Sequence, residues 1–268
     1  MLKKSLFFVL IFVKLSLFGQ TITLVTWNLC NFGKSKSSEE IAFIANELKS
    51  ADIVAIQEVS TTDFGAQAVA KLADELNRKG AKWDYVISNP TNGAGKERYA
   101  YLWKTSKISI SGKGFLAEEL DKEFDREPFM ARFSIGKSKI LLATLHAVPK
   151  DKNPAEECKY LFMLEKLYPN ENILIMGDFN LSEKEEAFTS LKKEGYNSAI
   201  INQKTSLKMK PSKTGEKLGN EYDNIFYEYQ LVEKLNAGIY EFYKKFVDLK
   251  TARTISDHVP VYLQFKIK

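Results

Sequence analysis

The sequence predicts a mixed α/β domain in which strand-rich layers are covered by helices. Apolar runs of strand length recur along most of the chain, and two segments near the N-terminus repeat apolar side chains at helical spacing. The 268 residues are 44% hydrophobic and 27% charged, which is ordinary for a globular protein and excludes disorder for most of the chain. Since no internal repeat or low-complexity linker divides it, we expect residues 21–268 to form one domain.

The first third of this domain alternates strands with helices. Residues 21–29 are rich in β-branched side chains and predict a strand, and residues 52–59 predict a buried strand. Between them, Ser37 and Glu40 have the spacing of a capping box at the start of a helix. A second helix, which Gly80 would end, is predicted by an apolar stripe of Val69, Leu72, Ala73 and Leu76.

Strands crowd the middle of the chain, and further helices and strands follow them. The predicted middle strands are 83–88, 98–104, 107–111, 129–135 and 140–146. Pro154 suits the first turn of a helix over 154–167. Ser182 and Glu185 are spaced as a capping box for another helix, ending near Gly195. The remaining predicted segments are a loop over 202–221 and strands over 223–232 and 258–267.

The N-terminal residues predict export. Lys3 and Lys4 precede a short apolar stretch, and small residues follow it, as in a secretory signal peptide. An uncleaved membrane anchor is the alternative, but Lys14 leaves the apolar run short of the ~20 residues that a span needs. We therefore expect residues 1–20 to be a cleaved signal and the protein to be secreted or periplasmic. Cleavage would lower the formal charge from +5 to +2, which permits an anionic substrate without arguing for one.

The chain has two cysteines, Cys30 and Cys158. In an exported protein they could pair, but sequence cannot show that they lie close together. Neither has the spacing of a metal site, so we expect two unpaired, partly buried thiols.

Polar side chains recur where apolar strands meet loops, which is where sites on sheets form. These side chains are Asn28, Glu58, His146, Asp178, Asn180, Asp223, Asp257 and His258. His146 and His258 are the only histidines, and imidazole is the group best suited to moving protons near neutral pH. An isolated histidine is usually a satisfied core or surface residue, but each of these sits among other unusual polar groups.

The carboxylates in this set predict a metal site. Glu58, Asp178 and Asp257 offer hard oxygen ligands, which favour Mg²⁺, Ca²⁺ or Mn²⁺ over zinc. Asp178 and Asn180 are two positions apart, so in extended chain they would point to one face, where Asn180 could hold a substrate oxygen or a water. An isolated Asp-x-Asn is more often a turn. Together with the histidines, the set predicts metal-assisted hydrolysis of an anionic substrate.

The order and spacing of five short motifs resemble the endonuclease/exonuclease/phosphatase superfamily, and within it deoxyribonuclease I. The motifs are TWNL (26–29), IQEV (56–59), LHAVP (145–149), GDFN (177–180) and SDHVP (256–260). Residues 96–110, 124–135 and 220–227 extend the likeness, which covers nearly all of residues 22–265. The resemblance implies a four-layer sandwich of two packed mixed β-sheets flanked by helices. It also implies divalent-metal-dependent cleavage of phosphodiesters.

Carried over position by position, the resemblance implies a catalytic pair, His146 and His258. It implies that Glu97 orients His146, that Asp223 orients His258, and that Arg126 contacts phosphate; Glu97 and Arg126 could alternatively be surface charges. We expect His258 to act as base and His146 as acid, or the reverse. Glu58 resembles the metal-binding glutamate, and the surrounding metal and phosphate ligands would be Asn28, Asp178, Asn180 and Asp257. Arg126, Asn28 and Asn180 would stabilise the charge on phosphorus.

Three positions depart from the deoxyribonuclease pattern. Ser60, Gly95 and Cys30 stand where those enzymes commonly carry an arginine, a tyrosine and an arginine that contact DNA. The family's small-loop disulfide is also absent between 112 and 128. These departures put tight duplex binding in doubt, although they leave the hydrolytic residues in place.

The expected function is that of an exported, Mg²⁺-dependent phosphodiesterase acting on nucleic acid, as a DNA endonuclease and a monomer without a stable protein partner. A phosphatase or phosphodiesterase acting on phospholipid, inositol phosphate or a small nucleotide is the alternative. A catalytically inactive binding module is a third reading, which the complete set of expected catalytic residues argues against.

Overall fold

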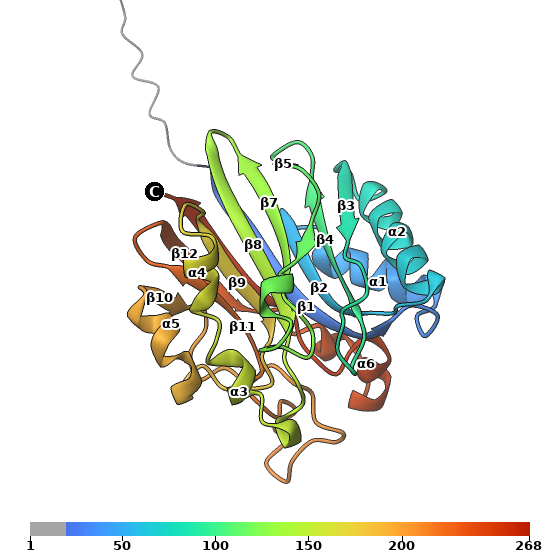
Figure 1. The fold of residues 1–268 in the computed structure, drawn as a ribbon. Helices are drawn as coiled ribbons and strands as arrows, with labels where there is room; N and C mark the ends of the chain where they lie inside the picture. The colour runs from blue at the N-terminus through green and yellow to red at the C-terminus, as the bar shows by residue number, and fades with distance from the viewer. Residues whose placement is uncertain (1–19) are drawn as a thin grey trace, which may run out of the picture.

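The computed structural model describes residues 20–268 and contains two β-sheets packed face to face, with helices on both outer sides (Figure 1). This is the expected four-layer sandwich of mixed sheets, so the fold prediction is confirmed. The predicted signal peptide lies outside the described residues, apart from Gln20. No helix within residues 20–268 is long and apolar enough to cross a membrane.

The first sheet has the order β12-β13-β1-β2-β4-β3. Its strands are β12 (Val232–Ile239), β13 (Val261–Ile267), β1 (Ile22–Phe32), β2 (Ile53–Val59), β4 (Arg98–Lys104) and β3 (Trp83–Ile87). Among them only β1 and β2 pair in parallel. Strands β1 and β2 therefore end at the same edge of the sheet.

The second sheet has the order β10-β11-β9-β8-β7-β5, and β6 pairs with β7 beside this path. Its strands are β10 (Tyr196–Ser198), β11 (Asp223–Glu228), β9 (Ile173–Asp178), β8 (Ser138–His146), β7 (Phe129–Ile135), β5 (Ile108–Ile110) and β6 (Phe115–Leu116). Here β8 and β9 are the parallel pair, and the other pairings are antiparallel.

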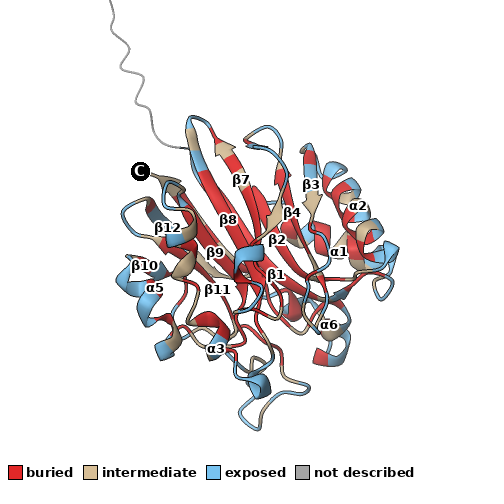
Figure 2. Cartoon of the chain, viewed as in Figure 1, coloured by how far each residue is buried: buried red, intermediate tan, exposed pale blue. Residues whose placement is uncertain are grey.

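Three apolar layers hold the sandwich together, and the central strands of both sheets are buried along most of their length (Figure 2). The middle layer joins the two sheets through large side chains such as Tyr101, Phe133 and Phe265. The outer face of the first sheet is covered by α1 (Ser38–Leu48), α2 (Asp63–Asn77) and α6 (Leu249–Ile255). The outer face of the second is covered by α3 (Ala155–Cys158), α4 (Met163–Leu167) and α5 (Thr189–Lys193).

Several predicted elements are confirmed in detail. The capping box of Ser37 and Glu40 is formed at the start of α1, with Glu40 N donating to Ser37 Oγ and Ser37 N donating to Glu40 Oε2. The stripe of Val69, Leu72, Ala73 and Leu76 is buried on α2. Cys30 is half-buried and Cys158 is buried, and both are free thiols.

Two predicted helices are wrong in extent. The segment 154–167 forms two short helices separated by turns. The backbone N–H groups of Tyr160, Leu161 and Met163 bond to carbonyls three positions earlier, and not four as in an α-helix, so the α-helix is interrupted there. The capping box at Ser182 and Glu185 is absent: Glu185 N donates to the Ser182 carbonyl and not to its Oγ, and the Ser182 hydroxyl donates to Glu221 at 2.7 Å. Only Thr189–Lys193 is α-helical there, after a 3₁₀ turn.

The predicted strand over 223–232 is two strands. Strand β11 ends at Glu228, a turn follows, and β12 runs over Val232–Ile239. Strand β12 lies at the edge of its sheet and is largely exposed, so its sequence lacks the apolar alternation of a half-buried strand. Helix α6 was likewise not predicted, although Asp248 caps it by accepting from Thr251 N at 2.7 Å.

Candidate active site

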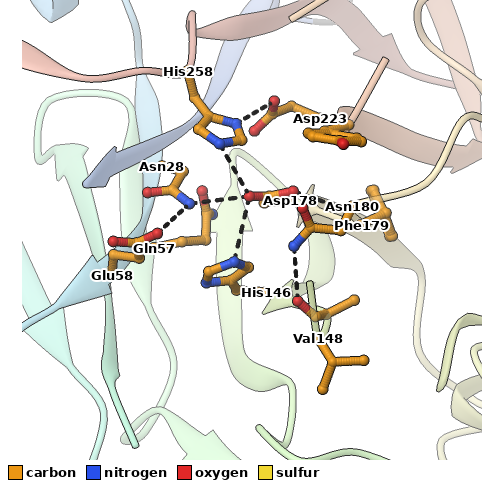
Figure 3. Close-up of polar contacts among 12 residues, drawn as sticks. Asn28, Gln57, Glu58, His146, Val148, Asp178, Phe179, Asn180, Asp223 and His258 are labelled. Carbon is orange, nitrogen blue, oxygen red and sulfur yellow. Dashed lines mark hydrogen bonds and ion pairs between the residues drawn. The ribbon is translucent and has the colours of Figure 1, made fainter. Parts of the chain in front are cut away.

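Polar side chains from both sheets meet at one edge of the sandwich. Strands β1 and β2 bring Asn28 and Glu58 there, and β8 and β9 bring His146 and Asp178 (Figure 3). Asp223 joins them because β11 runs antiparallel to β9, so that its first residue pairs with Asp178 at the end of β9. Side chains far apart in the sequence thus converge because parallel strands end together and an antiparallel neighbour begins there.

His258 is held in a fixed orientation just before β13. Its Nδ1 donates to Asp223 Oδ2 at 2.8 Å, and both side chains are buried. The backbone N of His258 donates to Ser256 Oγ, and its carbonyl accepts from Trp27 Nε1 at 2.8 Å. Asp223 is fixed in turn, since its backbone N donates to Thr205 Oγ1. With Nδ1 protonated on the carboxylate, Nε2 is the nitrogen left for chemistry.

His146 is held in the same way at the end of β8. Its Nδ1 donates to Glu97 Oε2 at 2.9 Å, and its backbone N donates to the Tyr99 hydroxyl at 3.1 Å. Glu97 is buried just before β4, and its other oxygen accepts from Glu58 N. Glu97 is therefore part of the buried network beside His146, which excludes the surface-charge reading.

Asp178 lies between the two imidazoles. Its Oδ2 is 3.4 Å from His146 Nε2 and 3.5 Å from His258 Nε2, and Figure 3 shows the rings approaching it from opposite sides. Asp178 also accepts from Asn28 Nδ2 at 3.0 Å and, through Oδ1, from Asn180 N at 2.9 Å. Both Nε2 atoms thus point into one small volume around a single buried carboxylate.

The carboxylates govern the charge of both rings. Burial disfavours the charged form of His258, but Asp223 and Asp178 outweigh it and raise the pKa of His258 well above its usual value. The pKa of His146 is also raised, because Glu97 and Asp178 outweigh burial. Burial opposes the charge of Asp178, but His258 and His146 hold its pKa below the usual value. Burial and Asp178 raise the pKa of Asp223 to about 6, which His258 opposes.

Asn28 joins two carboxylates that would otherwise repel each other. Its Nδ2 donates to Glu58 Oε1 at 2.9 Å and to Asp178 Oδ2, while its Oδ1 accepts from Cys30 N at 2.9 Å. Glu58 Oε2 accepts from Asn31 N at 2.8 Å. Glu58 itself has φ +59°, a left-handed conformation at the end of β2 that aims its side chain along the cleft.

Glu58 and Asp257 have the donor chemistry for a divalent cation. Both are only partly buried and line the same cleft, which has a volume of about 890 Å³. Mg²⁺ is commonly bound by one or two carboxylates, with water and substrate oxygens completing its shell, so these two residues fit it. Asp178, Asp223 and His258 also lie close enough to share an ion, although Asp178 Oδ2 already accepts from Asn28 and Asp223 Oδ2 from His258. Asp257 Oδ2 additionally accepts from Arg253 at 3.1 Å.

The expectation that Asp178 and Asn180 extend from one straight strand is wrong. Asn180 has φ +48°, so the chain turns sharply after Asp178. The Asn180 side chain donates to Ala147 O at 3.0 Å, which closes the turn onto the segment after β8. Both residues nevertheless line the cleft.

Arg126 is buried and directed mainly at protein acceptors. Its Nε donates to His146 O at 2.8 Å and its Nη2 to Ala147 O at 2.6 Å, while Nη1 is 3.4 Å from Glu97 Oε2. It lines the cleft and lies beside the His146–Glu97 pair. The geometry thus gives Arg126 a positioning contact with His146, and its contact with phosphate stays a prediction.

The three positions that depart from the deoxyribonuclease pattern, Cys30, Ser60 and Gly95, all line the cleft. They contribute no positive charge to it. Burial, Asp257 and Glu58 raise the pKa of the Cys30 thiol to about 11, so it is neutral near pH 7.

Sequence reasoning missed several residues that hold the site in place. Tyr99, Ser256 and Thr205 bind the backbone of His146, His258 and Asp223. Glu157 accepts from the backbone of Asp125 and Val148 and so ties together two loops of the site. Tyr222 stacks beside His258 with ring centroids 6.2 Å apart. Ser256 lies within the SDHVP motif and Tyr222 beside Asp223, so these two could have been suspected; the others have no local signal.

Comparisons with known proteins agree with this geometry. The sequence model of the protein family described as the Endonuclease/Exonuclease/phosphatase family matches residues 25–258 of this chain. Deoxyribonuclease-1-like 1 of Sus scrofa is 30% identical, over 80% of this chain and 70% of that protein. A deoxyribonuclease of Thioalkalivibrio sp. (strain K90mix) is 28% identical, over 99% of this chain and 77% of that protein.

Solved structures agree on the fold. An endonuclease/exonuclease/phosphatase family protein from Bacteroides thetaiotaomicron superposes with a TM-score of 0.68 at 16% identity, over 93% of this chain and 99% of that chain. The resemblance drawn from the five motifs, to this superfamily and to its deoxyribonuclease I-like members, is confirmed. The chain belongs to the endonuclease/exonuclease/phosphatase family.

Proposed function

We propose that the protein is a divalent-metal-dependent phosphodiesterase that hydrolyses nucleic acid, as a DNA endonuclease. One observation carries the proposal: His146 and His258 are each held through Nδ1 by a carboxylate, and both direct Nε2 at Asp178. Two oriented imidazoles on either side of one point can remove a proton from a nucleophile and return one to a leaving group.

In the proposed reaction, His258 Nε2 accepts a proton from a water while the water oxygen forms a bond to phosphorus. Asp223 fixes the tautomer of His258 and stabilises the imidazolium that results. His146 Nε2, protonated at the outset, donates its proton to the leaving oxygen as the bond from that oxygen to phosphorus breaks. Glu97 holds His146 for this step. The raised pKa values of both rings also permit the two roles to be exchanged.

Negative charge grows on the phosphate oxygens during attack. Asn180 lines the cleft and can donate to these oxygens if its side chain leaves Ala147 O, and Arg126 flanks them. A divalent cation bound by Glu58 and Asp257 would supply positive charge at the same place. We propose Mg²⁺, with Ca²⁺ and Mn²⁺ as the other hard cations that suit these oxygens.

A smaller or lipid-like phosphodiester is the second candidate substrate. It is favoured by one observation, that Cys30, Ser60 and Gly95 line the cleft in place of the two arginines and the tyrosine expected for tight binding of duplex DNA. The deoxyribonuclease names of relatives across most of the chain favour nucleic acid.

Export as a monomer, with cleavage near residue 20, belongs to the same proposal. N-terminal sequencing of the secreted protein tests the cleavage site, and its native mass tests whether it is a monomer.

The decisive assay uses purified residues 21–268 and supercoiled plasmid, with Mg²⁺ or with chelator. We expect nicking that requires the metal, and replacing His146 or His258 by Ala should lower turnover at least ~10²-fold. Hydrolysis of phospholipid or a small phosphodiester, without action on any DNA or RNA, would instead establish the second candidate. Near-normal nicking by both alanine variants would remove the proposed mechanism.

A further inference from the structure

The segment between β10 and β11 forms a basic hairpin beside the cleft. We define it as residues 207–218; Leu207 pairs with Leu218, and Lys208 N donates to Lys217 O. It extends away from the sheets at the lower edge of Figure 1, and its tip is exposed in Figure 2. Its lysines are Lys208, Lys210, Lys213 and Lys217, against the single acid Glu216.

The base of the hairpin is bonded to the segment that carries His258. Leu207 N donates to Asp257 O at 2.6 Å, and the preceding residue, Ser206, pairs with His258 itself. Arg253 donates to Leu207 O at 2.6 Å from the other side. The hairpin therefore has a fixed position relative to the proposed catalytic histidine.

The tip is also ordered by its own hydrogen bonds. Ser212 N donates to Glu216 O, and Glu216 N donates to Ser212 Oγ at 3.0 Å. Glu216 pairs with Lys204 and Lys208, so these two lysines are largely neutralised. Within residues 20–268, Lys210 and Lys213 have no carboxylate partner, and both are exposed. Two free positive charges are thus presented on a rigid turn.

Two further hollows connect the hairpin with the cleft. One, of about 360 Å³, shares Asn180 with the cleft and is also lined by Lys150, Lys184 and Lys204, together with Glu185 and Glu221, which pairs with Lys184. The next, of about 570 Å³, shares Lys204 with the first and reaches Lys217 in the hairpin. Lys150, Lys204 and Lys217 therefore lie along the hollows that lead from the cleft to the hairpin, in addition to Lys34 and Lys96 in the cleft itself.

We propose that the hairpin 207–218 is a second binding surface for the nucleic-acid backbone, which contacts phosphates several nucleotides from the one that is cleaved. The inference rests on the proposed function and adds where a long substrate is held. A repeating phosphate backbone matches lysines that are spread along the hollows and the tip. An anionic membrane fits less well, because Met209 is the one large apolar side chain exposed on the hairpin and offers little surface to insert.

Salt dependence of binding tests this surface. The protein comprising residues 21–268 is mixed with a labelled 30-base-pair DNA duplex in the presence of a metal chelator, which prevents cleavage. Its affinity for the duplex is measured at salt concentrations between 50 and 200 mM. A plot of log affinity against log salt has a negative slope. The double variant Lys210→Gln, Lys213→Gln should reduce the magnitude of that slope by about two, since each phosphate contact contributes ~0.9. The ratio of wild-type to variant affinity should then rise about tenfold as salt falls from 200 to 50 mM.

A matched control removes the same charge elsewhere. Lys137 and Lys139 are exposed at the opposite end of β8 from His146, and Lys137→Gln, Lys139→Gln should retain the wild-type slope. Equal slopes for the two double variants overturn the inference while wild-type plasmid nicking still supports the proposed function. If the Lys210→Gln, Lys213→Gln variant no longer sediments with anionic phospholipid vesicles but keeps the wild-type salt slope of DNA binding, the hairpin binds membranes and the inference is also overturned. Failure of the wild type on every nucleic acid refutes the proposed function itself.

Discussion

Nδ1 of His258 donates to Oδ2 of Asp223 at 2.8 Å, and the second oxygen of this carboxylate, Oδ1, has no hydrogen-bond partner within residues 20–268. The buried carboxylate of Asp223 therefore interacts with the His258 imidazole through Oδ2 alone. In the proposed reaction this pairing has two consequences. It fixes which nitrogen of His258 faces the substrate, and it sets the pH at which that nitrogen loses its proton.

Replacing Asp223 by Asn should therefore lower turnover about 10²–10⁴-fold and change the pH profile. Asp223 raises the pKa of His258, so removing its charge lowers that pKa. A base must be unprotonated, and the acidic limb of kcat/KM should consequently move to lower pH. Asp248→Asn is the control, because Asn caps a helix as well as Asp and this residue does not line the cleft. An unchanged acidic limb in Asp223→Asn would contradict His258 as base.

Glu97→Gln tests the other histidine. Loss of the Glu97 charge should lower the pKa of His146, which that charge raises. A general acid must be protonated, so the alkaline limb of kcat/KM should move to lower pH, with turnover reduced at least ~10²-fold. If the acidic limb moves instead, His146 is the base and the two histidines exchange roles.

The positions of the central polar residues could be predicted from the sequence because strand ends are local signals. Asn28, Glu58, His146 and Asp178 each follow an apolar run, and parallel pairing brings such ends to one edge of a sheet. The sequence motifs then indicated Glu97, which has no strand-end signal of its own, and the structure places it 2.9 Å from His146.

Other features depend on tertiary contacts that no sequence pattern encodes. The left-handed turn at Asn180 follows from its contact with Ala147, more than thirty positions away. Ser182 forms no capping box because Glu185 N donates to its backbone carbonyl, while its hydroxyl donates to Glu221 in a distant segment. Thr205 can be recognised as a support for Asp223 only when the loop 202–221 is seen folded over β11. Edge strand β12 escaped prediction because it buries too little to need an apolar pattern.

Glu58→Gln should weaken metal binding. Replacing the carboxylate by an amide removes a negative charge from the proposed Mg²⁺ site while keeping its size. Titration calorimetry should show a reduced affinity for Mg²⁺. Wild-type protein at a metal concentration of 100 Kd should gain about 2.7 kcal/mol in unfolding free energy, and the variant at that same concentration should gain much less.

The control for this measurement is Glu118→Gln, which removes an exposed carboxylate that does not line the cleft. It should bind Mg²⁺ as the wild type does. Equal Mg²⁺ affinity in Glu58→Gln and wild type would place the cation elsewhere, and Asp178 with Asp223 and His258 would then be the group to examine.

Gly177 lets β9 approach β8 closely because it has no Cβ, and its replacement should destabilise the whole site. It has φ +140°, and a Cβ built there would lie 2.0 Å from Leu145 O, which is backbone and cannot move aside. Gly177→Ala should therefore cost about 2–5 kcal/mol in unfolding free energy, measured by urea denaturation. Gly136 also has a positive φ, +59°, but a Cβ there meets nothing within 4 Å, so Gly136→Ala should cost only about 1 kcal/mol. A loss in Gly177→Ala no larger than in Gly136→Ala would show that β8 and β9 can separate at this point. In that case the distance between Asp178 and the two imidazoles would not depend on the strand register that pairs Leu145 with Gly177 and His146 with Asp178.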